Sequence, residues 1–302
     1  MENDLSMGVA WMNGKLLPIS QAMIPVNDWG LVHSDITYDV VPVIDGAFFR
    51  FDDYLARFLS SMENLHLDPG VTKLDIQTAL HQMVGKSNFR DSYVAMVCSR
   101  GKPKIAGSRD PRDCENHFFA WCVPYVHIIK PEIVKQGATA WIAQNAYRIP
   151  ENSVNPLVKN YHWGDFTQGI FEAKDKDYET VILLDYDGNI TEGPGFNVFA
   201  VKDKVLITPD RGVLAGVSRK TVLEMAEHLG INTSVRSLSV EELLGADEVF
   251  LSSSGGGVIP IIRVNETIFG NGASGPISVQ LNETYWNWTT LEKYRDPIDY
   301  AL

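Results

Sequence analysis

The sequence predicts an α+β fold, because hairpin signals and helical patterns occur together in its 302 residues. Asn13-Gly14 and Asp45-Gly46 each separate apolar residues, which is typical of a tight two-residue hairpin turn. Apolar residues recur at helical spacing between Asp52 and Leu65, and again between Val217 and Leu229. A chain of this length has room for two domains or for one large domain.

The N-terminal part combines two helices with two long strands. The helix expected at residues 52–65 can be capped by Asp52 or Asp53. Its apolar stripe consists of Leu55, Phe58, Leu59, Met62 and Leu65. A second helix is expected from Val71 to Val84, ended by Gly85. The runs SYVAMVCSRG and HFFAWCVPYV predict buried strands on either side of a polar loop at residues 101–116.

The C-terminal part begins with a predicted strand, ATAWIAQNAYRI, and a helix at residues 164–173. Residues 179–209 predict four short strands, with turns at Asp187-Gly188 and at residues 202–204. The clearest helix, residues 217–229, ends at Gly230. Its stripe consists of Val222, Met225, Ala226 and Leu229. The run DEVFLSSSGGGVIPIIRV predicts two strands joined by a turn of small residues.

Composition limits the classes of function. The net charge of −12 argues against a nucleic-acid partner or an anionic membrane surface. Three cysteines, Cys98, Cys114 and Cys122, make no disulfide framework, so a cytoplasmic location is expected. No signal peptide and no membrane-spanning run are expected either. The seven histidines are scattered without ligand spacing, so no metal site is expected.

The segment NPLVKNYHWGDF places Lys159 among apolar and aromatic residues rather than among charges. A lysine withdrawn from water has a lowered pKa, so its free amine can attack a carbonyl group and form a Schiff base. A loop lysine whose stem merely lies along apolar surface would give the same pattern. Taken alone, this segment leaves both interpretations open.

The segment TEGPGFNVF places one carboxylate, Glu192, at the start of a glycine-rich turn. A carboxylate beside a pyridine nitrogen keeps that nitrogen protonated and therefore electron-withdrawing. An ordinary hairpin with a solvated glutamate is the alternative. The segment therefore suggests a cofactor contact without proving it.

Two further segments are typical of anion sites. In GVLAGVSRKTV, Val217 and Ser218 open a helix after Gly216, where free N–H groups and the helix dipole favour an anion. In SSSGGG, residues 252–257, hydroxyl groups and unhindered glycine amides suit a phosphate. A plain serine cap and a flexible loop are the alternatives. Arg57 lies off the apolar stripe of its helix and can point toward a pocket or into solvent.

Together these segments resemble the fold-type IV pyridoxal-phosphate enzymes, and the likeness extends from about Trp11 to Pro276. Four motifs carry it in the family's order: VKNYHWGDFTQGIFEA, EGPGFNVF, GVLAGVSRKTV and FLSSSGGGVIPI. The segment HSDITYDVVPVIDGAFFRFDDYLAR is most similar to the (R)-selective amine transaminases, and so is VKNYHWGD. The resemblance implies a small N-terminal α/β domain at residues 1–124 and a linker at 125–130. A larger domain with a β-barrel-like core then covers residues 131–302.

The resemblance also implies a role for each residue. Lys159 would hold pyridoxal 5'-phosphate as a Schiff base and shuttle the proton, and Glu192 would pair with the pyridine nitrogen. Leu214 would pack on the ring. The phosphate would be held by Arg57, Val217, Ser218, Ser253 and Ser254. The substrate pocket would be lined by His33, Tyr38, Val40, Trp163, Gly255 and, more weakly matched, Tyr93. Relatives are homodimers, so we expect a homodimer with the active site near the interface.

The implied activity is ping-pong transfer of an amino group from an (R)-amine or D-amino acid to a keto acceptor. Two departures from the pattern affect the acceptor: Ala106 stands where many (R)-amine transaminases have an arginine, and Ala95 where several relatives have an acid. Lys102, Lys104 or Arg109 could substitute for the arginine. The alternatives are a branched-chain or D-amino-acid aminotransferase, an aminodeoxychorismate lyase-like enzyme, and a cofactor-free scaffold.

Overall fold

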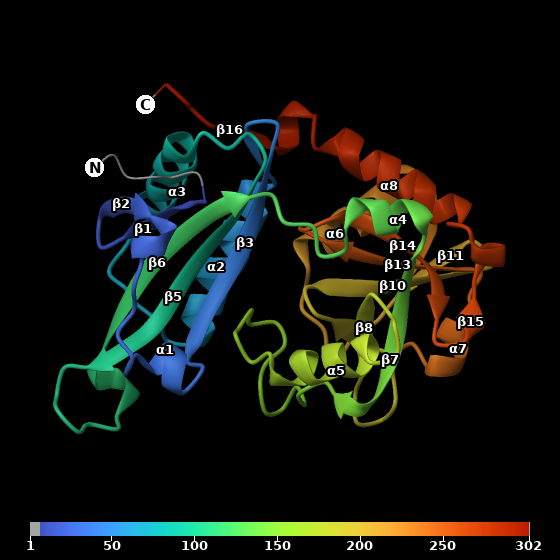
Figure 1. Ribbon diagram of the computed structural model, residues 1–302, viewed down its shortest axis with the longest axis horizontal. Helices are drawn as coiled ribbons and strands as arrows, with labels where there is room; N and C mark the ends of the chain where they lie inside the picture. The colour runs from blue at the N-terminus through green and yellow to red at the C-terminus, as the bar shows by residue number, and fades with distance from the viewer. Residues whose placement is uncertain (1–6, 302) are drawn as a thin grey trace. The chain divides into compact units, whose positions relative to one another are not determined.

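The computed structural model describes residues 7–301, which form two compact units, each with its own sheet and helices (Figure 1). Within the described chain, the first unit contains residues 7–126, 158–162 and 291–301, and the second contains residues 127–157 and 163–290. The predicted α+β class is therefore confirmed. The predicted domain boundaries stay a prediction, and the contacts show in addition that residues 158–162 and 291–301 pack with the N-terminal part.

The sheet of the first unit is antiparallel, with the strand order β16-β4-β3-β5-β6-β1-β2. Its strands are β1 (Val9–Met12), β2 (Lys15–Pro18), β3 (Ile36–Ile44), β4 (Ala47–Phe49), β5 (Ser92–Pro103), β6 (Cys114–Pro124) and β16 (Arg295–Pro297). Both predicted hairpin turns are confirmed, between β1 and β2 and between β3 and β4. Asn13, Gly14, Asp45 and Gly46 have φ values of 53°, 74°, 47° and 74°. Positive φ at both central residues is the geometry that Asn-Gly and Asp-Gly favour.

Two predicted helices of the first unit are confirmed, but their ends differ from the prediction. Helix α2 is Phe51–Asn64, and its N-cap is Arg50, in the left-handed region at φ 56°. The prediction that Asp52 or Asp53 caps this helix is wrong. Both aspartates lie in its first turn, where the positive end of the helix dipole stabilises a carboxylate.

Helix α3 is Lys73–Ser87, so the prediction that Gly85 ends it is also wrong. Gly85 lies inside the helix. Glycine is required there because a Cβ atom would lie 2.5 Å from the Asp299 carbonyl oxygen. Thr72 caps the start: its hydroxyl accepts from the Asp75 N–H, while the Asp75 carboxylate accepts from the Thr72 N–H. This reciprocal capping box satisfies two of the free N–H groups at the helix start.

The sheet of the second unit has the strand order β12-β11-β10-β13-β14-β7-β8, with β9 added to β10 and β15 to β14. Its strands are β7 (Ala138–Tyr147), β8 (Thr180–Leu184), β9 (Glu192–Gly193), β10 (Phe196–Lys202), β11 (Val205–Thr208), β12 (Asn232–Val235), β13 (Glu248–Ser253), β14 (Gly257–Val264) and β15 (Thr267–Ile268). An apolar core fills this unit, with Ala140, Val198, Leu238 and Val264 fully buried. The four strands and two turns predicted over residues 179–209 are confirmed.

The helices of the second unit include both that the sequence predicts, α5 (Gly164–Lys174) and α6 (Val217–His228). Gly230 follows α6 at φ 69°, as expected for a glycine that ends a helix. Three helices were not predicted: α4 (Pro131–Gln136), α7 (Val240–Leu244) and α8 (Pro276–Trp288). Helix α8 is anchored by Glu248, whose carboxylate accepts from the N–H groups of Ile277 and Ser278. Among residues 7–301, no helix is long and apolar enough to cross a bilayer.

The capping box of α3 allows a direct test of local stability. We expect Thr72→Ala to lower the free energy of unfolding by about 1 kcal/mol, because an N-cap hydroxyl acceptor is lost. Thr72→Ser keeps the hydroxyl and should change the free energy by no more than a few tenths of a kcal/mol. Urea denaturation followed by circular dichroism measures both. Equal stability of the alanine and serine variants would contradict this role of the hydroxyl group.

Candidate functional site

In the first unit, Lys159 belongs to a short segment, residues 158–162, that makes one antiparallel bridge to β3, between Asn160 and Thr37. Its carbonyl oxygen accepts from the Tyr38 N–H at 3.2 Å and from the Thr37 hydroxyl at 2.6 Å. Its own N–H donates to the Ser61 hydroxyl at 3.3 Å. The backbone of Lys159 is thus fixed by β3 and α2, and its side chain is only partly exposed. This arrangement explains why a lysine stands in an apolar stretch.

Aromatic rings surround the amine of Lys159 within this unit. The Nζ atom lies 4.5 Å from the centroid of the Tyr38 ring, a cation–π distance. Tyr38 stacks in turn on Tyr161, with centroids 4.3 Å apart. Burial raises the pKa of the Tyr161 hydroxyl, and the neighbouring Tyr38 and Tyr93 raise it further. The Tyr161 hydroxyl is therefore neutral, and no tyrosinate charge stands in this aromatic pair.

Arg57 makes a bidentate ion pair with Asp39, in which Nε lies 2.8 Å from Oδ2 and Nη2 lies 2.6 Å from Oδ1. Asp39 is fully buried on β3. Burial alone would lower the pKa of Arg57, but the Asp39 carboxylate raises it above its ordinary value. The guanidinium group is thus held charged and oriented, as an anion ligand requires.

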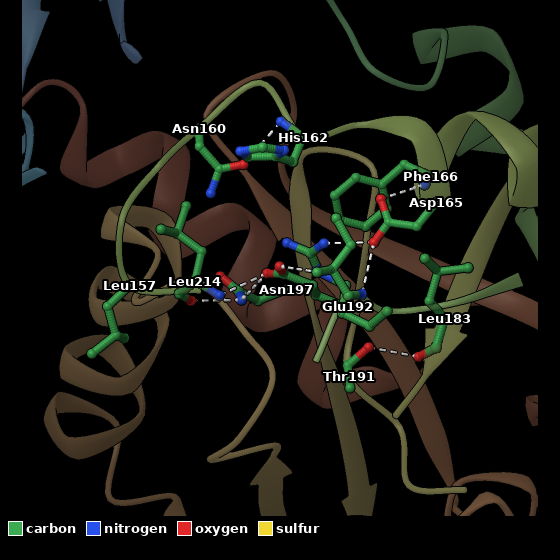
Figure 2. Close-up of polar contacts among 12 residues, drawn as sticks. Leu157, Asn160, His162, Asp165, Phe166, Leu183, Thr191, Glu192, Asn197 and Leu214 are labelled. Carbon is green, nitrogen blue, oxygen red and sulfur yellow. Dashed lines mark hydrogen bonds and ion pairs between the residues drawn. The ribbon is translucent and has the colours of Figure 1, made fainter. Parts of the chain in front are cut away.

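In the second unit, Glu192 lies on β9 and is 5% exposed. Its Oε2 accepts from the Leu214 N–H at 2.8 Å and, more weakly, from the Asn197 side-chain amide at 3.4 Å (Figure 2). Its Oε1 accepts from Arg148 Nε at 3.1 Å. These donors stabilise the ionised carboxylate and fix its orientation.

Arg148 links Glu192 to a second buried acid, Asp165. Its Nη1 lies 2.6 Å from Asp165 Oδ2, and its guanidinium carbon lies 4.3 Å from the Phe166 ring centroid. The Ile149 N–H also donates to Asp165. A guanidinium group between two buried carboxylates offsets the free-energy cost of removing them from water.

The start of α6 has the features of an anion site. Gly216 is its N-cap and supplies no side-chain cap, so the first N–H groups of the helix, including those of Val217 and Ser218, point out of its end without an intrahelical partner. Gly216 is required here, because a Cβ atom would lie 2.1 Å from the Asn197 side-chain oxygen. The Ser218 hydroxyl is buried and makes no hydrogen bond with the described residues. At an anion-binding helix start, such a hydroxyl can donate to a ligand.

The SSSGGG segment joins β13 to β14, and its serines have different environments. The Ser253 hydroxyl donates to the Gly195 carbonyl at 2.8 Å and accepts from the Gly255 N–H at 3.1 Å. The Ser252 hydroxyl is buried and, within the described chain, makes no hydrogen bond. Ser254 is partly exposed. The Gly255 carbonyl accepts from the Ile128 N–H, so this turn is held in place by backbone and side-chain bonds.

The predicted site residues divide between the units. Those of the first unit are His33, Tyr38, Val40, Arg57, Tyr93 and Lys159; those of the second are Trp163, Glu192, Leu214, Val217, Ser218, Ser253, Ser254 and Gly255. The structure brings Lys159 to Tyr38 and Glu192 to Leu214. His33 is exposed and contacts the Trp29 ring edge, while Val40 is buried in the sheet.

Sequence reasoning missed several residues that this geometry involves: Asp39, Arg148, Tyr161, Asp165 and Asn197. Charged residues within apolar runs are the signal that could have found some of them. Asp39 interrupts TYDVVPVI, and Arg148 ends the strand pattern ATAWIAQNAYRI. Such residues are rarely buried unless they are paired.

The second unit fits pyridoxal phosphate, the cofactor that the resemblance implies. The unpaired Ser218 hydroxyl and the end of α6 match a phosphate group. The ionised Glu192 matches a protonated pyridine nitrogen. Leu214 connects the two features, because its N–H binds Glu192 and its carbonyl oxygen accepts from the Asn197 amide.

Comparison with known proteins relates this chain to aminotransferases. Residues 37–264 match the family model for amino-transferase class IV. A putative branched-chain-amino-acid aminotransferase of Methanocaldococcus jannaschii is 27% identical over 91% of this chain and 94% of its own length. The D-alanine aminotransferase of Bacillus licheniformis is also 27% identical, over 91% of this chain and 95% of its own length.

Among solved structures, a branched-chain amino acid aminotransferase from T.th., crystallised with pyridoxamine 5'-phosphate, has a TM-score of 0.90. It is 23% identical and covers 98% of this chain and 100% of its own, which shows a shared fold. The predicted fold-type IV architecture is therefore confirmed. Because the family model covers most of the sequence, this chain belongs to the amino-transferase class IV family.

Proposed function

We propose that this chain is a pyridoxal-phosphate-dependent transaminase that moves an amino group from an (R)-amine or D-amino acid to a keto acceptor. The observation that carries the proposal is that one unit contains both Glu192, held by Arg148 and the Leu214 N–H, and a buried Ser218 hydroxyl. That hydroxyl makes no hydrogen bond with the described residues. A scaffold protein would need neither. The preference for (R)-amines rests on the resemblance of residues 33–57 and of VKNYHWGD.

Each residue then has a defined task. When bound, pyridoxal phosphate supplies an aldehyde that accepts the amine and a protonated ring that withdraws electrons from the neighbouring C–H bond. Glu192 would accept a hydrogen bond from the protonated ring nitrogen, and the Arg148 guanidinium group orients Glu192. Lys159 would anchor the aldehyde and, once its amine is free, would remove the proton from the substrate carbon and deliver it to the aldehyde carbon of the cofactor. Ser218, Ser253, Ser254, Arg57 and the Val217 amide would bind the phosphate.

A second candidate function is amino-acid transamination. It is favoured by the relatives, which include a putative branched-chain and a D-alanine aminotransferase. Both candidates use the same cofactor residues and differ only in how the substrate is recognised. The proposal also includes a cytoplasmic homodimer with its active site near the interface, which rests on the resemblance alone.

Substrate choice is tested by a donor panel. We expect (R)-1-phenylethylamine to be a better donor than its (S)-enantiomer, D-alanine and L-leucine, measured as kcat/KM. A clear preference for D-alanine or L-leucine would support the second candidate instead. We also expect weak selectivity for a carboxylate on the acceptor, because Lys102, Lys104 and Arg109 are exposed and a lysine does not replace a bidentate arginine. Tight, strongly preferred binding of pyruvate that persists in the K102A/K104A/R109A variant would contradict this.

Lys159 is tested by replacement and by trapping. We expect Lys159→Ala to lower kcat by at least about 1,000-fold, because a positioned proton-transfer group and the covalent anchor are lost together. Lys86→Ala, which removes an exposed lysine of α3, is the matched control and should leave kcat unchanged. Borohydride reduction followed by peptide mapping should label Lys159. Wild-type turnover in Lys159→Ala, or label on a different lysine, would refute the assignment.

The phosphate site is tested with two buried serines. We expect Ser218→Ala to weaken pyridoxal phosphate binding about tenfold or more, because a hydrogen bond to a charged group is lost. Ser92 in the first unit is the matched control, since its hydroxyl is also buried without a partner among the described residues. Ser92→Ala should leave the affinity unchanged. Titration of the apoprotein, followed by absorbance, measures both variants, and equal affinities would exclude Ser218 from the site.

The expected assembly is tested by mass. A homodimer predicts about twice the chain mass of 33.7 kDa by light scattering of the purified protein. A monomer that is fully active at the same concentration would show that one chain forms the whole site.

A further inference from the structure

Lys159 and Tyr161 present their side chains on the same side of the segment that bridges to β3. The isolated bridge between Thr37 and Asn160 is antiparallel, so Tyr38 lies opposite Lys159. Opposite residues in an antiparallel pair point to the same side, and the stack of Tyr161 on Tyr38 places the Tyr161 ring on that side as well. The side chains of Tyr38, Lys159 and Tyr161 therefore share one face of the first unit.

The contacts agree with this placement. The Tyr38 ring is 6% exposed and lies 4.5 Å from Lys159 Nζ. Tyr161 stacks on it at 4.3 Å with an interplanar angle of 27°, yet remains 37% exposed. Tyr161 thus keeps part of its side chain accessible while it stacks on the ring that contacts the Lys159 amine. Stacked aromatic pairs keep such a ring in one orientation.

The neighbouring sheet positions on this face carry no charge. Tyr38, Val40 and Pro42 of β3 pair with Val97, Ala95 and Tyr93 of β5. The central pair, Val40 and Ala95, has small, buried side chains and lies between the pair that contains Tyr38 and the pair that contains Tyr93. The one acid nearby on β3, Asp39, points away and is paired with Arg57. Apart from the Lys159 amine, these described positions of β3 and β5 offer no charged side chain to a substrate, whereas a flat apolar group would lose little hydration there.

We propose that Tyr161 is a specificity-determining residue, which stacks on the flat apolar substituent of the amine donor next to Lys159. This inference rests on the proposed transaminase function and names its substrate class: donors with an aryl group rather than a short alkyl chain. Tyr161 was not among the pocket residues expected from the sequence, which were His33, Tyr38, Val40, Tyr93, Trp163 and Gly255.

The test uses holoenzyme and two carbinols that lack the reacting amine, (R)-1-phenylethanol and (R)-2-butanol. Calorimetry gives the ratio of their dissociation constants, which reports binding without turnover. We expect Tyr161→Leu to lower the preference for the phenyl compound about three- to tenfold, the range expected for one aromatic contact. Tyr161→Phe keeps the ring and should change the ratio by less than about twofold. If the leucine variant does not fold, Tyr161→Met takes its place.

A matched control removes a similar stack elsewhere. Tyr186 stacks on Tyr147 in the second unit, at 5.6 Å and 23°, and is 72% exposed. Tyr186→Leu should leave the carbinol ratio unchanged. A ratio in Tyr161→Leu equal to that of the wild type, or a wild type that binds both carbinols equally, would overturn the inference. Failure of every amine donor, with a ratio that still depends on Tyr161, would instead overturn the proposed function and leave the binding surface standing.

Discussion

The ion network of Arg148 with Glu192 and Asp165 is the constraint on which the second unit's site depends. Two buried carboxylates in one apolar unit would be too costly without a cation, and removal of the guanidinium group would leave both without their charged partner. The network also connects three parts of the chain: the end of β7, the start of α5 and the short strand β9. Their positions are therefore coupled through side chains that are nearly inaccessible to solvent.

The same carboxylate is connected to the start of α6 through Leu214 and Asn197. Glu192 accepts from the Leu214 N–H, and the Leu214 carbonyl accepts from Asn197, whose side chain also packs against Gly216. Gly216 is the N-cap of α6, so the start of this helix is connected to the Glu192 carboxylate through Leu214 and Asn197. One buried ion network thus fixes Glu192 and, through Leu214 and Asn197, the segment that leads into α6.

The first unit solves a comparable problem by backbone pairing. Lys159 is brought to β3 not by its own side chain but by its carbonyl oxygen and N–H, which bond to Tyr38, Thr37 and Ser61. The amine is left to contact an aromatic ring. On the other side of the strand, Arg57 is held charged by Asp39. Alternation along β3 thus places the Tyr38 ring, which contacts the Lys159 amine, and the Asp39 carboxylate, which pairs with Arg57, on opposite faces of the strand.

Local patterns in the sequence determined much of the fold. The hairpins at Asn13-Gly14 and Asp45-Gly46, and the helices α2, α3, α5 and α6, follow from turn chemistry and helical periodicity, which are properties of adjacent residues. The motifs around Lys159, Glu192 and Ser218 were visible for the same reason. Helix α8 was not, because its start depends on Glu248, which is distant in sequence.

Tertiary structure alone decided which charged and aromatic side chains contact one another. The pairs Arg57–Asp39 and Arg148–Glu192, and the stack of Tyr161 on Tyr38, join residues 18, 44 and 123 positions apart (57 − 39, 192 − 148 and 161 − 38). The cost of burying a charge depends on what lies within a few ångströms in space, and a single sequence does not give that distance. For this reason the sequence named the lysine and the glutamate, while their partners emerged only from the folded chain.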